Sequence, residues 1–491
     1  MITLTDKLES ITMSFSHFLP EAWLALGILI LTLAGLLISN KSFLAFLAAT
    51  FFSTSLLILV LNWPSQEPVS IFNNMLRTDG FSSYLKIIFD ISAIITVWMT
   101  WRDRFLTRRL SEYFALLLSV VLGAHLLVMS INFLMIFISL EMISLGSYVL
   151  AGFSFSKRGA EGSFKYFLFG SVASAIMLYG FTMIYGLTGQ LDFMSQDFAT
   201  HFVNNKSALL FISSLMALAG FLYKISAAPF HPWAPDVYEA APMPVVAFFS
   251  VVPKLAGIGI LTKFTLVMGS GGQPFYDWQS IIALIAILSI SIGNFSALWQ
   301  TKPKRLMAYS SIAQTGFLLV GLSSFLEHGI QFMLFYAAIY MIVNFLVFIY
   351  LQYFESLGFD SLETFSGVAK TAVVPVVFLL IGLIALTGLP PTAGFTSKFF
   401  VFSALWESYE LTGNSLLLWL LVFGLLNTVI SLFYYIRIPY YAFIRAGSVK
   451  VQTNIFVAEN LFGLVLVVLI LILFFNPGLL MGWINKINFV L

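Results

Sequence analysis

Lysines stand inside long apolar segments of this chain, where the hydrocarbon of a membrane is expected. The six that lie within such segments or at their edges are Lys86, Lys165, Lys224, Lys254, Lys263 and Lys398. A lysine near the centre of a bilayer costs about 2.5 to 3.5 kcal/mol on insertion scales, so it is rarely present without a partner or a task. Buried lysine releases its proton more readily than arginine does, and no arginine lies more than a few residues inside one of these segments. The pattern predicts ammonium groups that exchange protons.

Two of these lysines flank a proline-rich interruption of the apolar sequence. Residues 220–263 read GFLYKISAAPFHPWAPDVYEAAPMPVVAFFSVVPKLAGIGILTK, with Lys224 before the interruption and Lys254 in the apolar helix after it. A second interruption, TGLPPTAGF at residues 387–395, comes just before Lys398. Unwound backbone at membrane depth is tolerated only where protein or a water-filled cavity covers it. Each interruption therefore marks a candidate hydrated site.

One deep carboxylate, Glu141, accompanies the lysines. It lies in the middle of the apolar stretch NFLMIFISLEMISLGSYVLAGF and has no cation within helical reach on its own helix. We expect it to pair across helices with a lysine and to set the charge state of that lysine. The structural alternative is a packing carboxyl that is protonated or hydrogen-bonded. For Lys224 and Lys254 the alternative is a structural ion pair, and for Lys398 it is donation to carbonyls freed by the interruption.

Three further residues are candidates for proton transfer, with His231 and Lys263 ranked below Lys165. Lys165 lies near the cytoplasmic end of its span, where it either joins the relay or extends to the lipid headgroups. His231 lies in the first interruption, and the ordinary histidine pKa near 6.5 suits proton uptake, although a loop histidine also serves as a hydrogen-bonding group. Lys263 lies near the outer end of its span, where extension to the headgroups is the favoured interpretation.

Three ionisable residues are assigned no task by the sequence. Lys86 and Asp90 are four residues apart on one predicted helix, which favours a local ion pair. His125 is interpreted as a core residue.

Composition fixes the class of protein. Of 491 residues, 60% are hydrophobic and 9% are charged, against roughly 25% charged in soluble domains. We expect an all-α polytopic membrane protein in a lipid bilayer, with no nucleic-acid partner and no cleaved signal. The absence of cysteine excludes thiolate-held iron–sulfur clusters and disulfides. Five scattered histidines argue against a haem or metal site, so no cofactor is expected on this chain.

About 14 transmembrane helices are predicted, of which the seventh and twelfth are too long for one straight crossing and are broken at the two interruptions. The predicted spans are 19–38, 43–62, 81–101, 112–128, 131–153, 162–187, 207–241, 243–268, 278–299, 303–323, 328–354, 371–406, 415–436 and 455–476. The two broken helices lie five spans apart and cross the membrane in opposite directions. Broken helices at matching positions are typical of inverted repeats in transporters. We therefore expect two inverted five-helix repeats, helices 4–8 and 9–13.

These repeats divide the chain into four predicted regions. They are residues 1–111 with helices 1–3, 112–268 with the first repeat, 278–436 with the second repeat, and 437–491 with helix 14 and the tail. The positive-inside rule places both termini outside, since the cytoplasmic loops then hold 14 Lys and Arg residues and the outer loops hold four.

Several segments together resemble the antiporter-like proton-channel family. They are YKISAAPFHPWAPDVYEAAPMPV, VVPKLAGIGIL, SLEMISLGSYVLAGF, FKYFLFGSVASAIMLYG, KRLMAYSSIAQTGF and LTGLPPTAGFTSKFFVF. Within the family, the chain is most similar to the subunit N branch, also called subunit 2, of bacterial proton-pumping NADH:quinone oxidoreductase, respiratory complex I. The resemblance covers most of the chain. It matches the family's relay residues, in helix order, to Glu141, Lys165, Lys224, Lys254 and Lys398.

The resemblance implies a membrane-arm subunit of a proton-translocating NADH:quinone oxidoreductase, with no redox centre of its own. Protons would move through a lysine, glutamate and water relay driven by quinone reduction in other subunits. FMN, iron–sulfur clusters and quinone would belong to those other subunits. The implied partners are the antiporter-like subunit M and small subunits such as K and J, in a bacterial inner membrane with both termini periplasmic.

Three alternatives stay open at this point. Subunits of sodium/proton antiporter complexes and of membrane-bound hydrogenases share the same core. A scaffold whose lysines only lock helices together is a different class of function. A thylakoid membrane is an alternative location.

Overall fold

The computed structural model describes residues 12–63, 68–104, 106, 108–204, 207–269, 277–447 and 457–487. Both chain ends, on which the prediction of periplasmic termini rests, lie outside these residues. The chain forms two compact units. Unit 1 contains residues Met1–Ile225, Ala240–Trp278 and Lys486–Leu491, and unit 2 contains Ser226–Glu239 and Gln279–Asn485. Each unit is described by itself.

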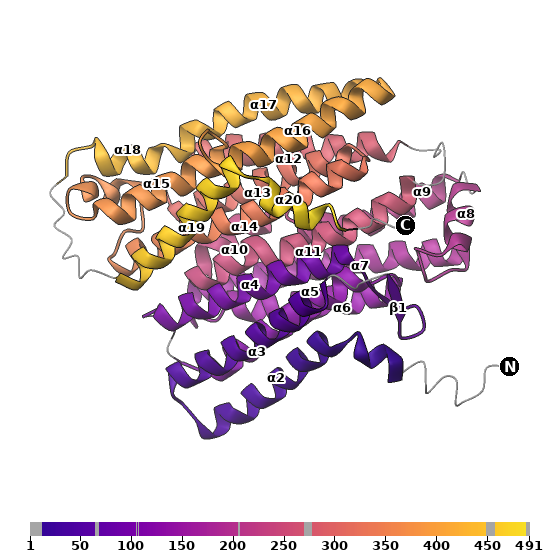
Figure 1. Ribbon diagram of the computed structural model, residues 1–491, viewed down its shortest axis with the longest axis horizontal. Coiled ribbons are helices and arrows are strands. Elements are labelled where there is room, and N and C mark those ends of the chain that lie inside the picture. The colour runs from indigo at the N-terminus through magenta and orange to yellow at the C-terminus, as the bar shows by residue number, and fades with distance from the viewer. Residues whose placement is uncertain are drawn as a thin grey trace. The chain divides into compact units, whose positions relative to one another are not determined.

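Unit 1 consists of long apolar helices and one small hairpin. Its helices are α2 (Leu19–Leu37), α3 (Lys41–Leu61), α4 (Gly80–Arg102), α5 (Leu110–Met129), α6 (Phe133–Ala151), α7 (Lys157–Thr188), α8 (Gln196–Asn204), α9 (Ala208–Lys224) and α11 (Met243–Gly269). Helix α5 packs against α2, α4, α6 and α11, and α7 packs along α9 (Figure 1). Strands β1 (Val69–Ile71) and β2 (Leu76–Thr78) pair antiparallel, with Ser70 opposite Arg77.

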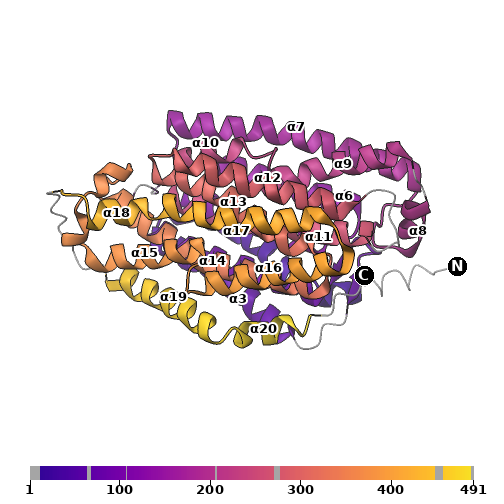
Figure 2. The same ribbon diagram turned by 90° about the horizontal axis from the view of Figure 1, so that it is seen from above.

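Unit 2 is built around one nearly fully buried helix, α14. The helices of this unit are α10 (Trp233–Ala240), α12 (Trp278–Leu298), α13 (Pro303–Ser323), α14 (Glu327–Ser356), α15 (Val373–Thr387), α16 (Ala393–Thr412), α17 (Ser415–Tyr435), α18 (Arg437–Phe443), α19 (Val457–Phe475) and α20 (Gly478–Ile484), with 3-10 turns η2 (Leu362–Phe365) and η3 (Val368–Lys370). Only the end residues Ala240 and Trp278 group with unit 1. Helix α14 packs against α13, α15, α16 and α19 (Figure 2).

The helices confirm the predicted class of a multi-pass, all-α membrane protein. Among the described residues, 12 helices are long and apolar enough to cross a membrane, and α9 and α15 are two shorter apolar helices. Each of the 14 predicted spans overlaps one of these helices, and at the two breaks it also overlaps a second helix. The arrangement as two inverted repeats and the four predicted regions stay predictions.

Both predicted helix breaks are confirmed. Helix α9 ends at Lys224 and α10 begins at Trp233, while α15 ends at Thr387 and α16 begins at Ala393. The backbone turns into the left-handed region at Ser226, with φ of 53°, and at Gly388, with φ of 85°. Prolines follow in each segment, and they lack the N–H that would continue a helix. Each break also contains a cis X–Pro bond, Ala228–Pro229 and Pro390–Pro391.

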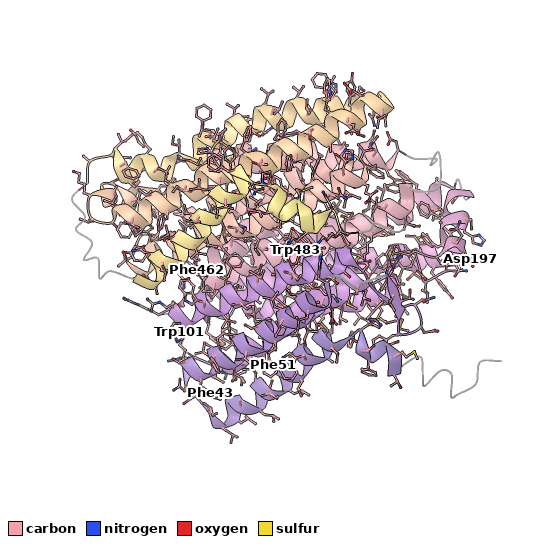
Figure 3. The ribbon with its side chains drawn as sticks, viewed as in Figure 1. Phe43, Phe51, Trp101, Asp197, Phe462 and Trp483 are labelled. Atoms are coloured by element: carbon pink, nitrogen blue, oxygen red, sulfur yellow. The ribbon has the colours of Figure 1, made fainter. Side chains whose placement is uncertain are left out.

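Many apolar side chains point away from the packed interior. Phe43, Trp101 and Trp483, which are labelled in Figure 3, are 43%, 44% and 45% exposed. Helices such as α2 and α17 bury only a minority of their residues, whereas α4, α11 and α13 are mostly buried. Exposed apolar surface on this scale suits contact with lipid tails. Of these buried helices, α11 holds the candidates Lys254 and Lys263.

Glycines allow α12 and α13 to approach closely. A Cβ on Gly316 of α13 would lie 2.8 Å from the backbone nitrogen of Ile290 and 2.9 Å from the carbonyl oxygen of Ala286. A Cβ on Gly293 of α12 would lie 2.6 Å from the backbone nitrogen of Ala313. Membrane helices use such small residues for backbone approach, because packing replaces the hydrophobic effect between them.

This contact predicts a position-specific loss of stability. We expect Gly316→Leu to force α12 and α13 apart and to lower the free energy of unfolding by about 1 to 3 kcal/mol. The matched control is Gly186→Leu in α7, where a Cβ meets nothing within 4 Å. Thermal unfolding of the purified chain in lipid or detergent measures both. Equal transitions for the two variants would contradict close packing at Gly316.

Candidate functional site

Lys224 lies against the part of α6 that holds Glu141. Lys224 is the last residue of α9 and is only 2% exposed. Its Nζ donates a hydrogen bond of 3.0 Å to Oγ of Ser144, which lies one helical turn after Glu141 on α6. The ammonium also interacts electrostatically with the Glu141 carboxylate. The end of α9 therefore places Lys224 against the face of α6 that holds the Glu141 carboxylate and the Ser144 hydroxyl.

Tyrosine side chains lie close to Glu141. The sequence analysis did not single them out. The rings of Tyr148 and Tyr166 lie 4.7 Å apart at 80°, and Tyr223 donates 2.8 Å to the carbonyl oxygen of Tyr166. Tyr148 and Tyr223 both interact electrostatically with Glu141. Gly170 of α7 leaves room for these hydroxyls, because a Cβ there would overlap the Tyr148 hydroxyl and lie 3.1 Å from that of Tyr223.

Lys254 lies deep inside α11. It follows Pro253, a proline within the helix, and is only 1% exposed. Proline lacks an N–H, so the carbonyl one turn earlier loses its helical hydrogen bond beside this lysine. All residues in the apolar stretch of α11 are buried inside the protein. Lys254 therefore lies within the packed interior of the protein.

Lys398 sits against the second helix break. Its Nζ donates a hydrogen bond of 2.8 Å to the carbonyl oxygen of Thr387, the last residue of α15, and lies 4.0 Å from the ring centre of Phe317. Gly388, with φ of 85°, lies directly beside the lysine stem, because a Cβ there would come within 2.7 Å of Lys398 Cδ. The contact with a freed carbonyl is the structural alternative considered from sequence for Lys398.

A network of uncharged polar side chains continues from this break. Gln314 of α13 donates 2.9 Å to the carbonyl oxygen of Leu386 and 3.2 Å to the hydroxyl of Tyr435, and Tyr336 donates to its side-chain oxygen. Tyr435 also contacts Ser310. One turn away on the same helix, Ser311 bonds Tyr238 at 3.2 Å and Tyr340 at 3.3 Å. Hydroxyl and amide groups of this kind relay hydrogen bonds without burying charge.

The proline-rich segment is anchored at its end by ion pairs within unit 2. Lys302 lies 2.6 Å from Glu239, and Arg305 lies 3.1 Å from Asp236 and 3.0 Å from Glu239. All four side chains are partly exposed, so the pairs contribute modestly to stability. Their effect is positional, because they tie α10 to the start of α13. His231, in the same segment, is half-buried.

Lys165 forms an ion pair on its own helix. Its Nζ lies 2.9 Å from Glu161, four residues earlier on α7, and the side chain is 40% exposed. An exposed pair of this type is screened by water.

The interpretation of Lys263 as a side chain that extends to the headgroups is wrong. Its Nζ donates 2.6 Å to the carbonyl oxygen of Val128 and lies 3.3 Å from Asp79. Asp79 caps α4 through Ser82. Burial alone would raise the pKa of Asp79, but the Lys263 ammonium and the bonds from Ser82 outweigh burial and hold that pKa below its ordinary value.

The local pair expected for Lys86 and Asp90 is also wrong. Lys86 pairs with Glu21 of α2 at 2.7 Å, and Asp90 accepts 2.7 Å from Ser55 of α3. His125, interpreted from sequence as a core residue, is fully buried but lies between the two carboxylates.

Comparison with known proteins gives consistent matches. The model of the family described as NADH:quinone oxidoreductase/Mrp antiporter, TM, matches residues 130–431. NADH-quinone oxidoreductase subunit N of Chlorobium chlorochromatii (strain CaD3) is 36% identical over 455 residues, which cover 90% of this chain and 87% of that protein.

Two solved structures have the same fold. A chain of the respiratory complex I from Thermus thermophilus with bound aureothin is 27% identical, with a TM-score of 0.80 over 96% of this chain and 100% of that one. A chain of the Mrp complex from Dietzia sp. DQ12-45-1b is 19% identical, with a TM-score of 0.81 over 95% of this chain and 96% of that one, a likeness of fold alone.

The contact between Gly388 and Lys398 predicts a measurable strain. An alanine in the left-handed region costs roughly 1 to 2 kcal/mol relative to glycine. We expect Gly388→Ala to lower the free energy of unfolding by more than this, because the new methyl group also displaces the Lys398 stem. Gly413→Ala is the matched control, since Gly413 has φ of 66° and a Cβ there meets nothing within 4 Å. Denaturant or thermal unfolding compares the two. A cost for Gly388→Ala no greater than that for Gly413→Ala would show that the lysine is not held against this turn.

Proposed function

The chain belongs to the NADH:quinone oxidoreductase/Mrp antiporter transmembrane family, and we propose that it acts as the subunit N type of proton-translocating subunit in the membrane arm of an NADH:quinone oxidoreductase, respiratory complex I. Relatives of that name are 36% identical or more over most of the chain. The observation that most favours proton transfer is the buried Lys224, which ends a broken helix against the Glu141 face of α6.

In the proposed relay, a proton enters from the cytoplasm near Lys224. Lys165 or His231 is the group through which it arrives. Lys224 holds the proton more tightly when Glu141 is ionised and close, because an opposite charge favours the charged form of the lysine. The hydroxyls of Ser144 and Tyr223 supply hydrogen-bonding positions around the pair. Glu141 thus sets how readily Lys224 releases its proton.

Lys254 and Lys398 are the later members of the relay, reached through bound water, after which the proton leaves outward. Lys398 has one anchored position, on the carbonyl oxygen of Thr387. The nearby network of Gln314, Tyr336 and Tyr435 offers hydroxyl groups that can pass a proton without becoming charged for long. Lys263, held by Asp79 and the Val128 carbonyl, is a secondary member.

The energy for transport comes from other subunits. Moving one charge against 100 mV costs about 2.3 kcal/mol. The chain has no cysteine with which to hold an iron–sulfur cluster. We assign FMN, iron–sulfur clusters and quinone to other subunits of the complex, and no redox centre to this chain. Antiporter-like subunit M and small subunits such as K and J are the proposed neighbours, in a bacterial inner membrane with periplasmic termini.

Substitution of Lys254 tests the relay. We expect Lys254→Ala in the assembled complex to abolish most proton pumping per electron transferred, because no other group at this position of α11 carries a proton. Lys370→Ala, at an exposed lysine that ends the 3-10 turn η3, is the control and should pump normally. Pumping is measured in proteoliposomes with a pH-sensitive dye while NADH oxidation is followed. Intact pumping at the original rate of electron transfer would remove Lys254 from the path.

Two other outcomes of the same experiment point to the alternatives. Loss of the assembled complex in every lysine variant would support the scaffold interpretation. Sodium-dependent transport that needs neither NADH nor quinone would support a sodium/proton antiporter.

Removal of the carboxylate tests its role in tuning Lys224. We expect Glu141→Gln to reduce pumping several-fold and to move the pH dependence of pumping toward lower pH, because Lys224 loses the charge that stabilises its ammonium form. Ser144→Ala removes a neutral partner of the same ammonium and should produce a smaller change. Pumping is measured across a pH series in proteoliposomes. An identical effect of the two substitutions would indicate that hydrogen bonding, rather than charge, governs Lys224.

A further inference from the structure

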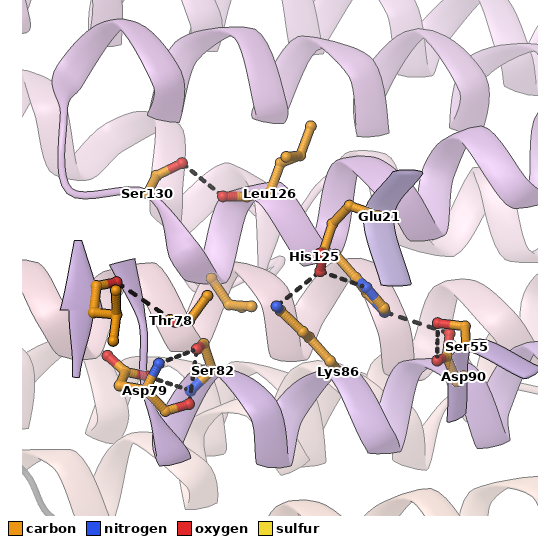
Figure 4. A network of polar contacts seen from close by, with 12 residues as sticks. Glu21, Ser55, Thr78, Asp79, Ser82, Lys86, Asp90, His125, Leu126 and Ser130 are labelled. Carbon is orange, nitrogen blue, oxygen red and sulfur yellow. Dashed lines mark hydrogen bonds and ion pairs between the residues drawn. The ribbon is translucent and has the colours of Figure 1, made fainter. Parts of the chain in front are cut away.

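Four helices of unit 1 enclose a cluster of ionisable side chains that the proposed relay does not use. Glu21 comes from α2, Lys86 and Asp90 from α4, and His125 from α5, and all four side chains are at most 2% exposed. Ser55 of α3 completes the cluster. Figure 4 shows the ring of His125 lying between the two carboxylates, with Lys86 on the far side of Glu21 and Ser55 beside Asp90.

The contacts define one unusual histidine. Nδ1 of His125 lies 3.2 Å from Oε1 of Glu21, and Nε2 lies 3.3 Å from Oδ1 of Asp90. Oε1 of Glu21 also receives the Lys86 ammonium at 2.7 Å. Both nitrogens of one imidazole therefore face a carboxylate oxygen.

A neutral imidazole does not satisfy this geometry. It has one N–H donor and one nitrogen lone pair, whereas carboxylates only accept. One lone pair would then point at a carboxylate oxygen about 3.3 Å away, which is repulsive. The imidazolium form has two donors, one for each carboxylate. A neutral histidine between two ionised acids is therefore one proton short of what the arrangement requires.

The charges give the same result. Glu21 and Asp90 carry two negative charges, and Lys86 carries one positive charge. With a neutral ring, one buried negative charge is left without a counter-charge, which is strongly disfavoured. With a protonated ring, the cluster is neutral. Geometry and charge thus both require one extra proton in the cluster, and on the imidazole that proton gives each carboxylate a donor.

The cluster also contains polar atoms that are not fully satisfied. Within the described part of the chain, Oε2 of Glu21, Oδ1 of Asp90 and Nε2 of His125 are buried and have no hydrogen-bond partner of good geometry. The contact between Nε2 and Asp90 is at ion-pair distance but is poorly aligned for a hydrogen bond. Buried polar groups of this kind are normally satisfied, by water if not by protein. The proton therefore has alternative acceptors within the cluster.

Other titratable groups near α5 do not replace these contacts. The elements that pack on α5 hold the following titratable or charged residues: Glu21 on α2, Lys41 on α3, Tyr84, Lys86, Asp90 and Arg102 on α4, Glu141 and Tyr148 on α6, Lys254 and Lys263 on α11, and Arg77 on β2; Glu112 and Tyr113 lie on α5 itself. The contacts to the ring nitrogens are those of Glu21 and Asp90.

We propose that Glu21, His125 and Asp90 form a second proton-binding site in this chain, separate from the lysine relay, in which His125 is held as an imidazolium between the two carboxylates. The site lies along a polar face of α4, since Ser82, Lys86 and Asp90 follow one another at four-residue spacing. The cap of the same helix, Asp79, pairs with Lys263. Helix α4 thus connects the second site to one candidate member of the relay.

The protonation state of the ring can be observed directly, without any pumping assay. The full chain, labelled with ¹⁵N-histidine and reconstituted in lipid nanodiscs, is examined by solid-state NMR at about pH 7.5, and His125→Gln identifies the signal. An ordinary histidine with a pKa near 6.5 would be only about one-tenth protonated at this pH. We expect His125 to be doubly protonated in nearly all molecules. A neutral His125 ring in the native chain would overturn the proposal.

Variants of the neighbours test the cause. The double variant Glu21→Gln, Asp90→Asn removes both acceptor charges while keeping side-chain size, and it should leave His125 neutral at about pH 7.5. Lys86→Met is the opposing control, because it removes the competing positive charge and should leave the imidazolium intact. Unchanged signals from the other histidines report that each variant is folded. An imidazolium that persists in the double variant would contradict the role of the carboxylates. The result is independent of whether Lys254 carries pumped protons.

Discussion

A charged side chain inside the membrane has no bulk water to solvate it, so its neighbours must do so. In this protein the buried ammonium groups meet that requirement in different ways. Lys86 lies on a carboxylate, Lys263 lies on a carbonyl oxygen beside a carboxylate, and Lys398 lies on a carbonyl oxygen and an aromatic face. Lys224 has a hydroxyl and a carboxylate at longer range. The strength of each local partner determines how firmly the proton is held.

The helix breaks follow from the same requirement. A continuous helix uses all its backbone carbonyls internally and leaves none for a lysine. Ending α15 at Thr387 frees a carbonyl oxygen that accepts from Lys398 eleven residues later. Ending α9 at Lys224 places the lysine itself at the helix terminus, where the C-terminal end of the helix favours a positive charge. The two breaks therefore stabilise their lysines differently. The break after α15 supplies a carbonyl oxygen to Lys398, and the break after α9 places Lys224 at a helix C-terminus.

The sequence predicted the helices, the two breaks and the deep burial of the central lysines, because these features depend on local patterns. Runs of apolar residues define spans, prolines interrupt them, and a lysine within a span has to be covered. Which residues meet across helices depends on tertiary packing. Lys86 and Asp90 satisfy the four-residue rule on one helix, but Glu21 and Ser55, distant in sequence, are the partners they meet. Lys263 was interpreted from its distance to the span end, and the cap residue Asp79 overrides that distance.

The tyrosines near Glu141 and those near the second helix break were missed for a related reason. In a chain with 52 phenylalanines and 19 tyrosines, an aromatic residue in a span gives no signal of its own. Its hydroxyl becomes informative only when its partner is known, as for Tyr223 with the Tyr166 carbonyl or Tyr435 with Gln314. One signal was present in the glycines. Gly170 opposes the hydroxyls of Tyr148 and Tyr223, so a small residue on a lipid-exposed helix marks the position where a neighbouring polar group needs space.

Local neutrality explains why uncharged polar groups and ion clusters occupy different parts of the protein. Around Lys398, the nearby Gln314, Tyr336 and Tyr435 add no fixed charge, so a proton that arrives or leaves changes the local charge by its full amount. Around His125, two carboxylates and one ammonium fix the charge in advance, and the ring completes the balance. The first environment suits a group that must change its charge in each cycle. The second suits a proton that stays in place until a neighbouring charge moves.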